Sequence, residues 1–345
     1  MTGRLALPIL AAAVALAAAP SAQAPTSAVD SYATAVRTYV ATGDTVKALT
    51  PIQAWAKPEF ERAIDALIAR RDQALIEAAA VLQVEIAVGV VMLSPRSAGT
   101  HLELGEKLIR SLRALPGPGP EAEFSEKWYA VAASAFLMVN DSRLASSFIS
   151  RGLQLAPGSL DLRLMNGIVD DLEALSLNPD DSKTGVQRQR IATARTQAFL
   201  RARDRYARLV KDAPSFARAR VRLGRVLWMI GQAEEARIEL LRAQADARDP
   251  VQQYLSAMFL GALYEQEGDA ALARAWYEEA LSLAPASQAA TVALGHLDVM
   301  VDRPDRARAL ARGLLSQKPV LDEWWTYNGG LETASLEWLR RRVRR

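Results

Sequence analysis

A fixed period of 34 residues near the C-terminal end of the chain constrains its fold more than any other feature. A period in this range is typical of helix–turn–helix units that stack in a row, because a single unit cannot bury its own apolar face. Apolar residues recur at helical spacing along most of the chain, and strict alternation is scarce. The sequence therefore predicts an all-α fold, an α-solenoid. The recurring pairs are Gly261 and Gly295, Ala273 and Ala307, and Pro285 and Pro319.

The clearest unit, residues 254–287, explains why these residue types recur. Gly261 and Ala273 fall where its two helices are expected to cross closely, since a larger side chain would push the backbones apart. Tyr277 is a bulky residue placed to fill the space around that crossing. Gly268 supplies the turn between the helices, because glycine accepts a positive φ.

The small and large residues of this unit follow one order: Leu260, Gly261, Tyr264, Gly268, Ala273, Tyr277, Ala280 and Pro285. In that order they resemble the tetratricopeptide repeat family. The resemblance implies a right-handed superhelix of helix pairs whose first helices line a concave groove. Weaker units are expected before and after this one, around Gly224 and Gly295. The last unit departs from the pattern at Asp298 and Asp302, where a bulky residue and the turn glycine are expected.

The predicted domain organisation has five parts along the chain. They are a signal peptide (1–24), a divergent N-terminal helical region (25–115), a Pro/Gly-rich linker or turn (116–125), the repeats (126–321, with an inserted loop at 176–187) and a C-terminal capping helix (322–345). The prolines and glycines of 116–120 either separate two modules or make a stiff turn inside one array. The sequence leaves both alternatives open.

The N-terminus predicts export from a bacterial cytoplasm. Arg4 precedes an apolar stretch, and small residues then offer signal-peptidase cleavage after Ala24 or, because Pro25 follows that site, after Ala28. An uncleaved alanine-rich anchor is the alternative. Arginine far outnumbers lysine and alanine is abundant, which is typical of a GC-rich bacterial genome. The chain has no cysteine, so it needs no oxidative folding. We therefore expect a periplasmic or secreted protein.

The sequence contains no recognisable catalytic, metal-binding or cofactor-binding motif. His101 and His296 lie far apart and outside the spacings that bind metals. Asp170 and Asp171 are neighbours that point apart on a helix, so they do not form an acid–base pair. A formal net charge of +3 gives no reason to expect nucleic acid. We expect no enzymatic activity, no cofactor, no metal and no nucleic-acid partner; an enzyme site in the N-terminal helices is the weaker alternative.

The resemblance also assigns a candidate peptide-binding groove to the first helices of the last three units. Its predicted residues are Arg218, Arg225, Trp228, Met229, Met258, Gln266, His296 and Met300. An apolar strip beside two arginines suits an extended peptide or a helix that carries one or two acidic groups. The alternative is that other segments of the chain cover this face. The predicted partner is a protein or peptide of unknown identity, and the predicted function is a scaffold or adaptor of the bacterial cell envelope.

The C-terminal segment allows two interpretations. Trp324, Trp325, Leu336 and Trp338 are suited to covering the apolar face of the last repeat, as solenoids require. The alternative is a structural or assembly role in which the arginine cluster of 340–345 docks to an anionic membrane or to an acidic protein. Membrane contact is the less favoured of the two.

Overall fold

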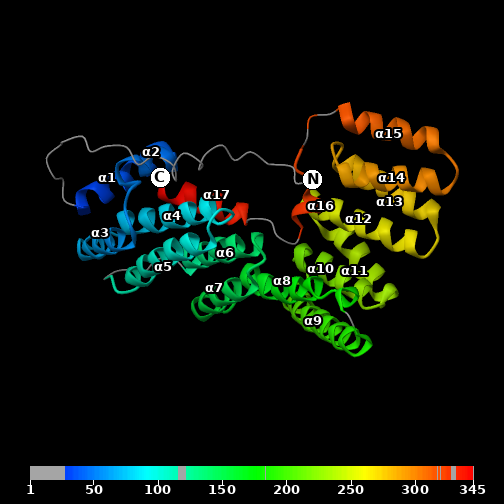
Figure 1. Ribbon diagram of the computed structural model, residues 1–345, viewed down its shortest axis with the longest axis horizontal. Helices are drawn as coiled ribbons and strands as arrows, with labels where there is room; N and C mark the ends of the chain where they lie inside the picture. Colours follow the sequence, from blue (N-terminus) through cyan, green and yellow to red (C-terminus); the bar gives the residue numbers. More distant parts are fainter. Residues whose placement is uncertain are drawn as a thin grey trace. The chain divides into compact units, whose positions relative to one another are not determined.

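The computed structural model describes residues 28–115, 122–182, 184–316, 318, 320–327 and 332–344. Within these residues every regular element is a helix, which confirms the predicted all-α fold (Figure 1). The predicted signal peptide and residues 116–121 of the predicted linker lie outside the described residues. The chain forms two compact units. Unit 1 comprises Met1–Leu162 and Leu331–Arg345, and unit 2 comprises Arg163–Gly330.

Unit 1 is a stack of short helical hairpins that is joined by the last helix of the chain. Its elements are α1 (Ala28–Thr42), α2 (Thr45–Leu49), η1 (Thr50–Ile52), α3 (Lys57–Ala69), α4 (Gln73–Val90), α5 (Pro95–Leu112), α6 (Ala122–Met138), α7 (Ser142–Leu155) and α17 (Thr333–Val343). Helices α4 and α5 pack together, as do α6 and α7. Helix α8 (Leu160–Ser176) begins at the end of unit 1 and continues into unit 2.

Unit 2 contains the regular repeats (Figure 1). After η2 (Pro179–Asp181) come α9 (Gly185–Asp212), α10 (Ala217–Met229), α11 (Ala233–Asp246), α12 (Pro250–Gln266), α13 (Ala270–Leu283), α14 (Gln288–Met300), α15 (Pro304–Ser316) and α16 (Glu323–Thr326). Helix α9 begins at Gly185, so the irregular segment is shorter than the predicted loop at 176–187. Helices α10 and α11, α12 and α13, and α14 and α15 form the three successive hairpins.

Side-chain caps set where many of these helices begin. In each case a short polar side chain accepts a hydrogen bond from a backbone N–H of the first turn, which would otherwise lack a partner. The capping residues include Asp72 of α4, Ser94 of α5, Asp141 of α7, Thr184 of α9, Asp249 of α12, Asp269 of α13 and Ser287 of α14.

Several turns between successive helices contain a residue with positive φ. In unit 2 these residues are Gly231, Gly268 and Asp302, with φ of 84°, 82° and 56°. Asp302 therefore adopts the conformation of the expected turn glycine, which aspartate tolerates better than most residues. Arg71 and Asn140 do the same in unit 1, with φ of 56° and 57°. Within the predicted N-terminal helical region, Arg71 lies in the turn between α3 and α4.

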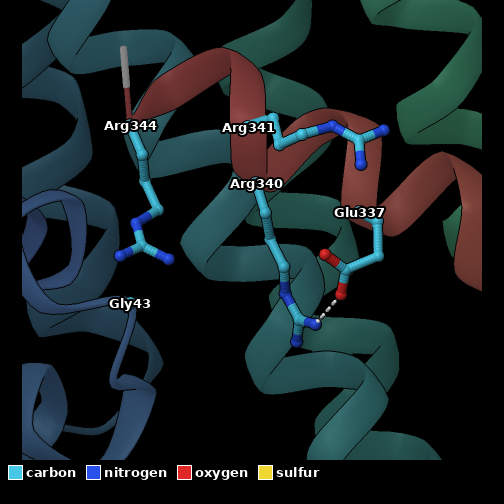
Figure 2. A pocket seen from close by; sticks show the side chains of 5 residues that line it. All are labelled: Gly43, Glu337, Arg340, Arg341 and Arg344. Atoms are coloured by element: carbon cyan, nitrogen blue, oxygen red, sulfur yellow. Dashed lines mark hydrogen bonds and ion pairs between the residues drawn. The ribbon is translucent and has the colours of Figure 1, made fainter.

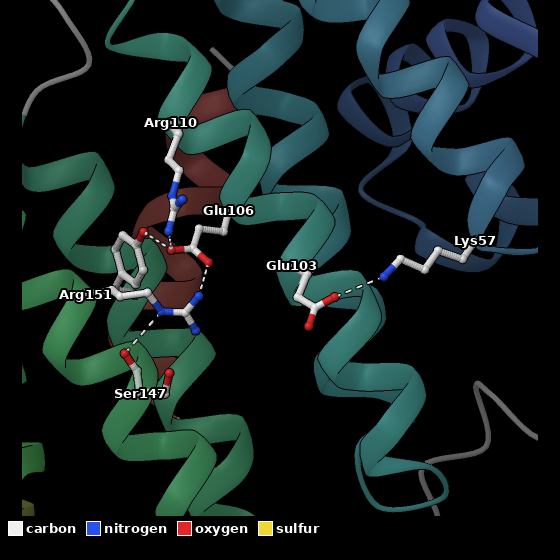
Figure 3. Close-up of polar contacts among 7 residues, drawn as sticks. Lys57, Glu103, Glu106, Arg110, Ser147 and Arg151 are labelled. Atoms are coloured by element: carbon white, nitrogen blue, oxygen red, sulfur yellow. Dashed lines mark hydrogen bonds and ion pairs between the residues drawn. The ribbon is translucent and has the colours of Figure 1, made fainter.

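The longest apolar helix, α4, lies in the interior of unit 1. By length and composition Gln73–Val90 could cross a membrane, but most of its residues are buried against other helices of the unit. Glu85 and Gln83 lie within it and are hydrogen-bonded, the latter to the hydroxyl of Tyr32 at 2.8 Å. A second buried carboxylate, Glu106 of α5, is held by Arg110 and Arg151 (Figure 3). These contacts place the polar groups of α4 and α5 inside the helical core of unit 1.

The sequence predicted that residues 322–345 cap the last repeat. Trp324 of this segment packs against the core of unit 2, which includes residues of α14, whereas helix α17 packs against α4 and α6 of unit 1. Leu336 and Leu339 are buried there, and the backbone N–H of Glu332 donates to the Ser134 hydroxyl at 3.1 Å. The physical reason is charge complementarity. Arg340 donates to both oxygens of Glu85, at 2.6 and 3.1 Å, and Arg342 pairs with Glu77.

Candidate functional site: the groove face of unit 2

The eight predicted groove residues lie on α10, α12 and α14, the first helices of the three hairpins in unit 2. We call the side of these helices that carries them the groove face. Trp228 and Met229 are half-buried at the end of α10, and Arg218 is half-buried near its start. Gln266, His296 and Met300 are exposed. The structure thus leaves part of the predicted site open.

Arg225 and Met258 are not available to a ligand, and the prediction is corrected for both. Met258 is 3% exposed and belongs to the hydrophobic core of unit 2. Arg225 is 7% exposed and donates to Asp171 of α8 at 2.7 Å. A buried ion pair of this kind is strongly destabilised when one partner is removed, since the other charge is left without compensation. Arg225 therefore serves the fold and does not recognise a partner's carboxylate.

Residues 322–327 lie on the groove face, and we call them the cover segment. The Asp322 carboxylate accepts hydrogen bonds from the Tyr254 hydroxyl (2.6 Å), the Ser287 hydroxyl (2.9 Å) and the backbone N–H of Ala289 (2.9 Å). Burial alone would raise the pKa of Asp322, but these bonds and one from the N–H of Trp324 lower it below its usual value. Asp322 thus ties the segment to α12 and α14.

Two aromatic rings of the cover segment pack beside Phe259 of α12. The ring centre of Trp324 lies 4.7 Å from that of Phe259, and the ring centre of Tyr327 lies 5.2 Å from it. The guanidinium carbon of Arg222 lies 4.2 Å from the centre of the Tyr327 ring, and Arg222 also donates to the backbone carbonyl of Tyr327. The predicted alternative, a face covered by another segment of the chain, is therefore what the structure shows at this end.

Buried polar atoms without hydrogen-bond partners gather around Tyr327. Among the described residues they include the hydroxyls of Tyr327 and Tyr206. Burial raises the pKa of Tyr327 to about 12 and that of Tyr206 well above its usual value. Each buried polar atom left unsatisfied costs roughly 1–3 kcal/mol. The covered arrangement is therefore stabilised by its aromatic packing and opposed by these atoms.

The open part of the groove face runs along the far ends of the same helices. The indole N–H of Trp228 donates to Gln266 at 2.6 Å, which links α10 to α12. His296 of α14 lies 3.3 Å from Glu265 of α12. Beyond these polar pairs α14 exposes Val292, Val299 and Met300, the last of which is 71% exposed. This open strip is apolar and is flanked by polar groups that already have partners.

Arg222, Phe259 and Tyr254 belong to the groove face but were not predicted. Arg222 lies four residues after Arg218 and three before Arg225, so helical spacing could have placed it on the same face. Phe259 is adjacent to Met258 in the sequence, and Tyr254 precedes Met258 by one helical turn. The position of the cover segment has no comparable signal, because it depends on where the chain returns after α15.

A hollow lies in unit 1 beside the C-terminal helix (Figure 2). Its volume is about 620 Å³, and Gly43, Glu337, Arg340, Arg341 and Arg344 line it. Arg340 is engaged by Glu337 and Glu85, whereas Arg341 and Arg344 have no carboxylate partner in the part of the chain that the structure describes. The guanidinium of Arg344 points to Gly43, which has φ of 68°. Such a hollow suits a small anion.

Neither histidine stands in a metal-binding arrangement within the described residues. No group of three or more His, Asp or Glu side chains there could hold a metal ion. Nδ1 of His101 lies 2.8 Å from Oε1 of Gln83, and the ring packs edge-on against Phe60. Burial lowers the pKa of His101 to about 4. His101 is therefore a neutral, half-buried residue of unit 1.

Comparison with known proteins places the repeat pattern in a family. Residues 256–287 match the tetratricopeptide repeat family. None of the curated proteins matches the sequence. Among solved structures the chain is similar to PilF of Pseudomonas aeruginosa, with 15% sequence identity over 65% of this chain and 89% of that chain and a TM-score of 0.45. MamA of Desulfovibrio magneticus RS-1 is 19% identical over 55% of this chain and 93% of that chain, with a TM-score of 0.39. Yeast Tom70 is 12% identical over 94% of this chain and 67% of that chain, with a TM-score of 0.42.

The matched segment covers most of α12 and all of α13, the hairpin in which the sequence pattern is clearest. This fold is typical of non-catalytic scaffolds for protein–protein interaction. Gly261 and Tyr277 lie at its helix crossing, and Gly268 lies at its turn, as the resemblance implies. Residues 256–287 thus carry a tetratricopeptide repeat, and they lie within an all-α arrangement of successive helix pairs.

Proposed function

We propose that this protein is an exported, non-catalytic adaptor of a bacterial cell envelope that holds another protein on the groove face of unit 2. Its repeat fold supports a role in protein–protein interaction, and its N-terminal sequence supports export. The partner binds first at the open strip of α14. The observation that carries the proposal is the exposure of Val292, Val299 and Met300 on one face of one helix.

The chemistry of this strip favours an apolar partner. Arg225 is occupied by Asp171, and His296 faces Glu265, so neither is free to select an acidic group. Flexible methionine and valine side chains adapt to an amphipathic helix or an extended apolar peptide. The ligand expected at this end is therefore an apolar segment, whereas the sequence alone favoured an acidic one.

A photoreactive amino acid at position 300 tests the proposal in the native cell envelope. A matched control carries the same amino acid at position 186, because Val186 of α9 is 68% exposed and lies away from the groove face. We expect a defined cross-linked protein from position 300 and none from position 186. The same cross-links from both positions, or none from position 300, would contradict the proposal.

The alternative function, docking of the C-terminal arginines to an anionic surface, retains one supporting observation. Arg341 and Arg344 line the hollow of unit 1, while Arg340 and Arg342 are occupied by Glu85 and Glu77. Sedimentation with vesicles rich in anionic lipid tests it. Binding that is lost in Arg341→Glu with Arg344→Glu would favour this alternative, and absence of binding by the unchanged protein would remove it.

A further inference from the structure

The cover segment makes the contacts that a bound peptide would make. Its carboxylate at Asp322 meets three donors, and its rings at Trp324 and Tyr327 pack beside Phe259. These partners belong to α12 and α14, and Arg222 adds a third first helix, α10. One short segment thus bridges three successive repeats through side chains spaced two and three residues apart.

The fit of this segment is incomplete. The Tyr327 and Tyr206 hydroxyls are buried without hydrogen-bond partners in the described part of the chain. Trp325, next to Trp324, remains 63% exposed on the same short helix. Unsatisfied buried groups oppose the covered state, because they recover hydrogen bonds to water when the segment leaves. A competing ligand that supplies the missing bonds would have an advantage over the segment itself.

We propose that residues 322–327 are a built-in pseudo-ligand of the groove face and that a peptide segment of a separate partner protein displaces them. The partner segment has the same chemistry: a carboxylate, an aromatic ring two residues later and a second ring three residues after that. This inference rests on the proposed function, since it names the ligand that completes binding begun at the open strip. It also explains why the face is half open and half covered.

Each recognition element has a stated partner on the groove face. The carboxylate binds the Tyr254 and Ser287 hydroxyls and the N–H of Ala289 at the start of α14, where the helix dipole also favours a negative charge. The first ring takes the place of Trp324 against Phe259, and the second takes the place of Tyr327 beneath Arg222. A peptide of six residues that adopts the same short helical turn is long enough to carry all three.

The test measures binding of a fluorescent synthetic peptide with the sequence of residues 320–327 to the full chain. The receptors are the unchanged protein and an opened variant, Asp322→Ala with Trp324→Ala and Tyr327→Ala. A site occupied in most molecules has a reduced apparent affinity for a second ligand. We expect the opened variant to bind the peptide at least about tenfold more tightly than the unchanged protein. Equal affinities would overturn the proposal.

Two controls distinguish specific recognition of the peptide from nonspecific binding. A peptide with Asp322→Asn should bind the opened variant at least about tenfold more weakly, because it loses charge-assisted hydrogen bonds. Trp325→Ala in the full chain should leave peptide binding unchanged, since that ring is exposed. Equal binding of the two peptides would overturn the assigned chemistry. Should the triple variant unfold, as circular dichroism would reveal, Trp324→Ala alone should give an intermediate gain, and no gain would overturn the proposal.

Sedimentation of the unchanged protein distinguishes a separate partner from a second copy of this chain. A monomer at all concentrations supports a separate partner, whereas a dimer that is lost on replacing Trp324 and Tyr327 would overturn it. The result is independent of the cross-linking experiment. Cross-links from position 300 without peptide binding would sink this inference alone, and peptide binding without cross-links would sink only the proposed function.

Discussion

Gly261 and Gly295 occupy the same position in successive repeats, yet their surroundings differ. A Cβ atom on Gly261 would lie 2.5 Å from the Tyr277 ring, while one on Gly295 would meet no atom within 4 Å. The difference follows from the residue that faces each glycine. The position that corresponds to Tyr277 one repeat later is Ala311, which has no ring to fill the space. The repeat pattern therefore fixes where the helices cross and leaves open how tightly they pack.

The two glycines give a matched stability prediction. Gly261→Ala should lower the free energy of unfolding by roughly 1–3 kcal/mol, because the Tyr277 ring has to move. Gly295→Ala should leave it unchanged or raise it by up to about 1 kcal/mol, since alanine is the better helix former and the space is open. Urea denaturation of both variants checks this. Equal losses would show that the two crossings are equally tight.

His101 predicts a pH dependence of stability. Its pKa is lowered to about 4 by burial, so the folded protein keeps the ring neutral while the unfolded chain takes up a proton near pH 6.5. This contribution is present above pH 6.5 and is lost as the pH falls toward 4. Between pH 6.5 and 4.5 it should decrease the free energy of unfolding by about 2 kcal/mol. The His101→Gln variant should lose less of its free energy of unfolding between pH 6.5 and pH 4.5, as urea denaturation at the two pH values would show. An identical loss in both proteins would exclude His101 as the cause.

At the scale of elements, α17 shows how a helix can belong to a distant part of the sequence. Its apolar side, with Leu336 and Leu339, is buried against α4 and α6, and its arginines meet the carboxylates of α4. Glu85 also accepts from the Tyr39 hydroxyl at 2.5 Å, so α1, α4 and α17 meet at one carboxylate. This junction makes α17 part of the core of unit 1.

A double-mutant cycle tests the docking of α17. Glu85→Gln and Arg340→Gln should each destabilise the protein, and their coupling energy should be about 1–3 kcal/mol because they touch within a partly buried junction. The control cycle uses Lys57 and Glu103, an exposed ion pair of the same unit (3.2 Å, Figure 3), for which less than about 1 kcal/mol is expected. A coupling for Glu85 and Arg340 as small as that of the control would mean that α17 is not docked in solution.

At the scale of the whole molecule, the residues that complete unit 1 come from both ends of the described chain. Helix α1 begins at Ala28 and supplies Tyr32, Val36 and Tyr39 to the core, while α17 closes the same unit. Removal of a signal peptide after Ala24 would leave α1 whole, and removal after Ala28 would take its first residue. Both forms are compatible with the folded unit.

The export hypothesis predicts a processed N-terminus. Mass spectrometry of protein isolated from the periplasm or culture medium of the producing bacterium should show a chain that begins at Pro25 or at Val29. Arg4→Glu, which removes the positive charge of the signal, should leave the protein unprocessed in the cytoplasm. Full-length protein in the cytoplasm of unaltered cells would contradict export.

The sequence predicted the elements of unit 2 better than their contacts. The 34-residue spacing, Gly268 and Pro285 were sufficient to place the hairpins, since each depends on residues close in sequence. The groove residues were predicted only in part. Trp228 and Gln266, which lie on the first helices of neighbouring repeats, are hydrogen-bonded to each other. Arg225 is instead paired with Asp171, which is more than fifty residues away in the sequence. No local pattern reveals that a partner so distant has already neutralised a candidate side chain.

By itself the sequence determined that this chain is an all-α repeat protein, where its hairpins turn and which faces of its first helices lie together. Helical periodicity, caps and turn residues act over a few positions, so they can be read from the chain. The tertiary structure alone decided that the cover segment lies on the groove face and that α17 joins unit 1. Those outcomes depend on which distant carboxylates, rings and apolar surfaces meet when the chain returns, and only the folded arrangement sets that.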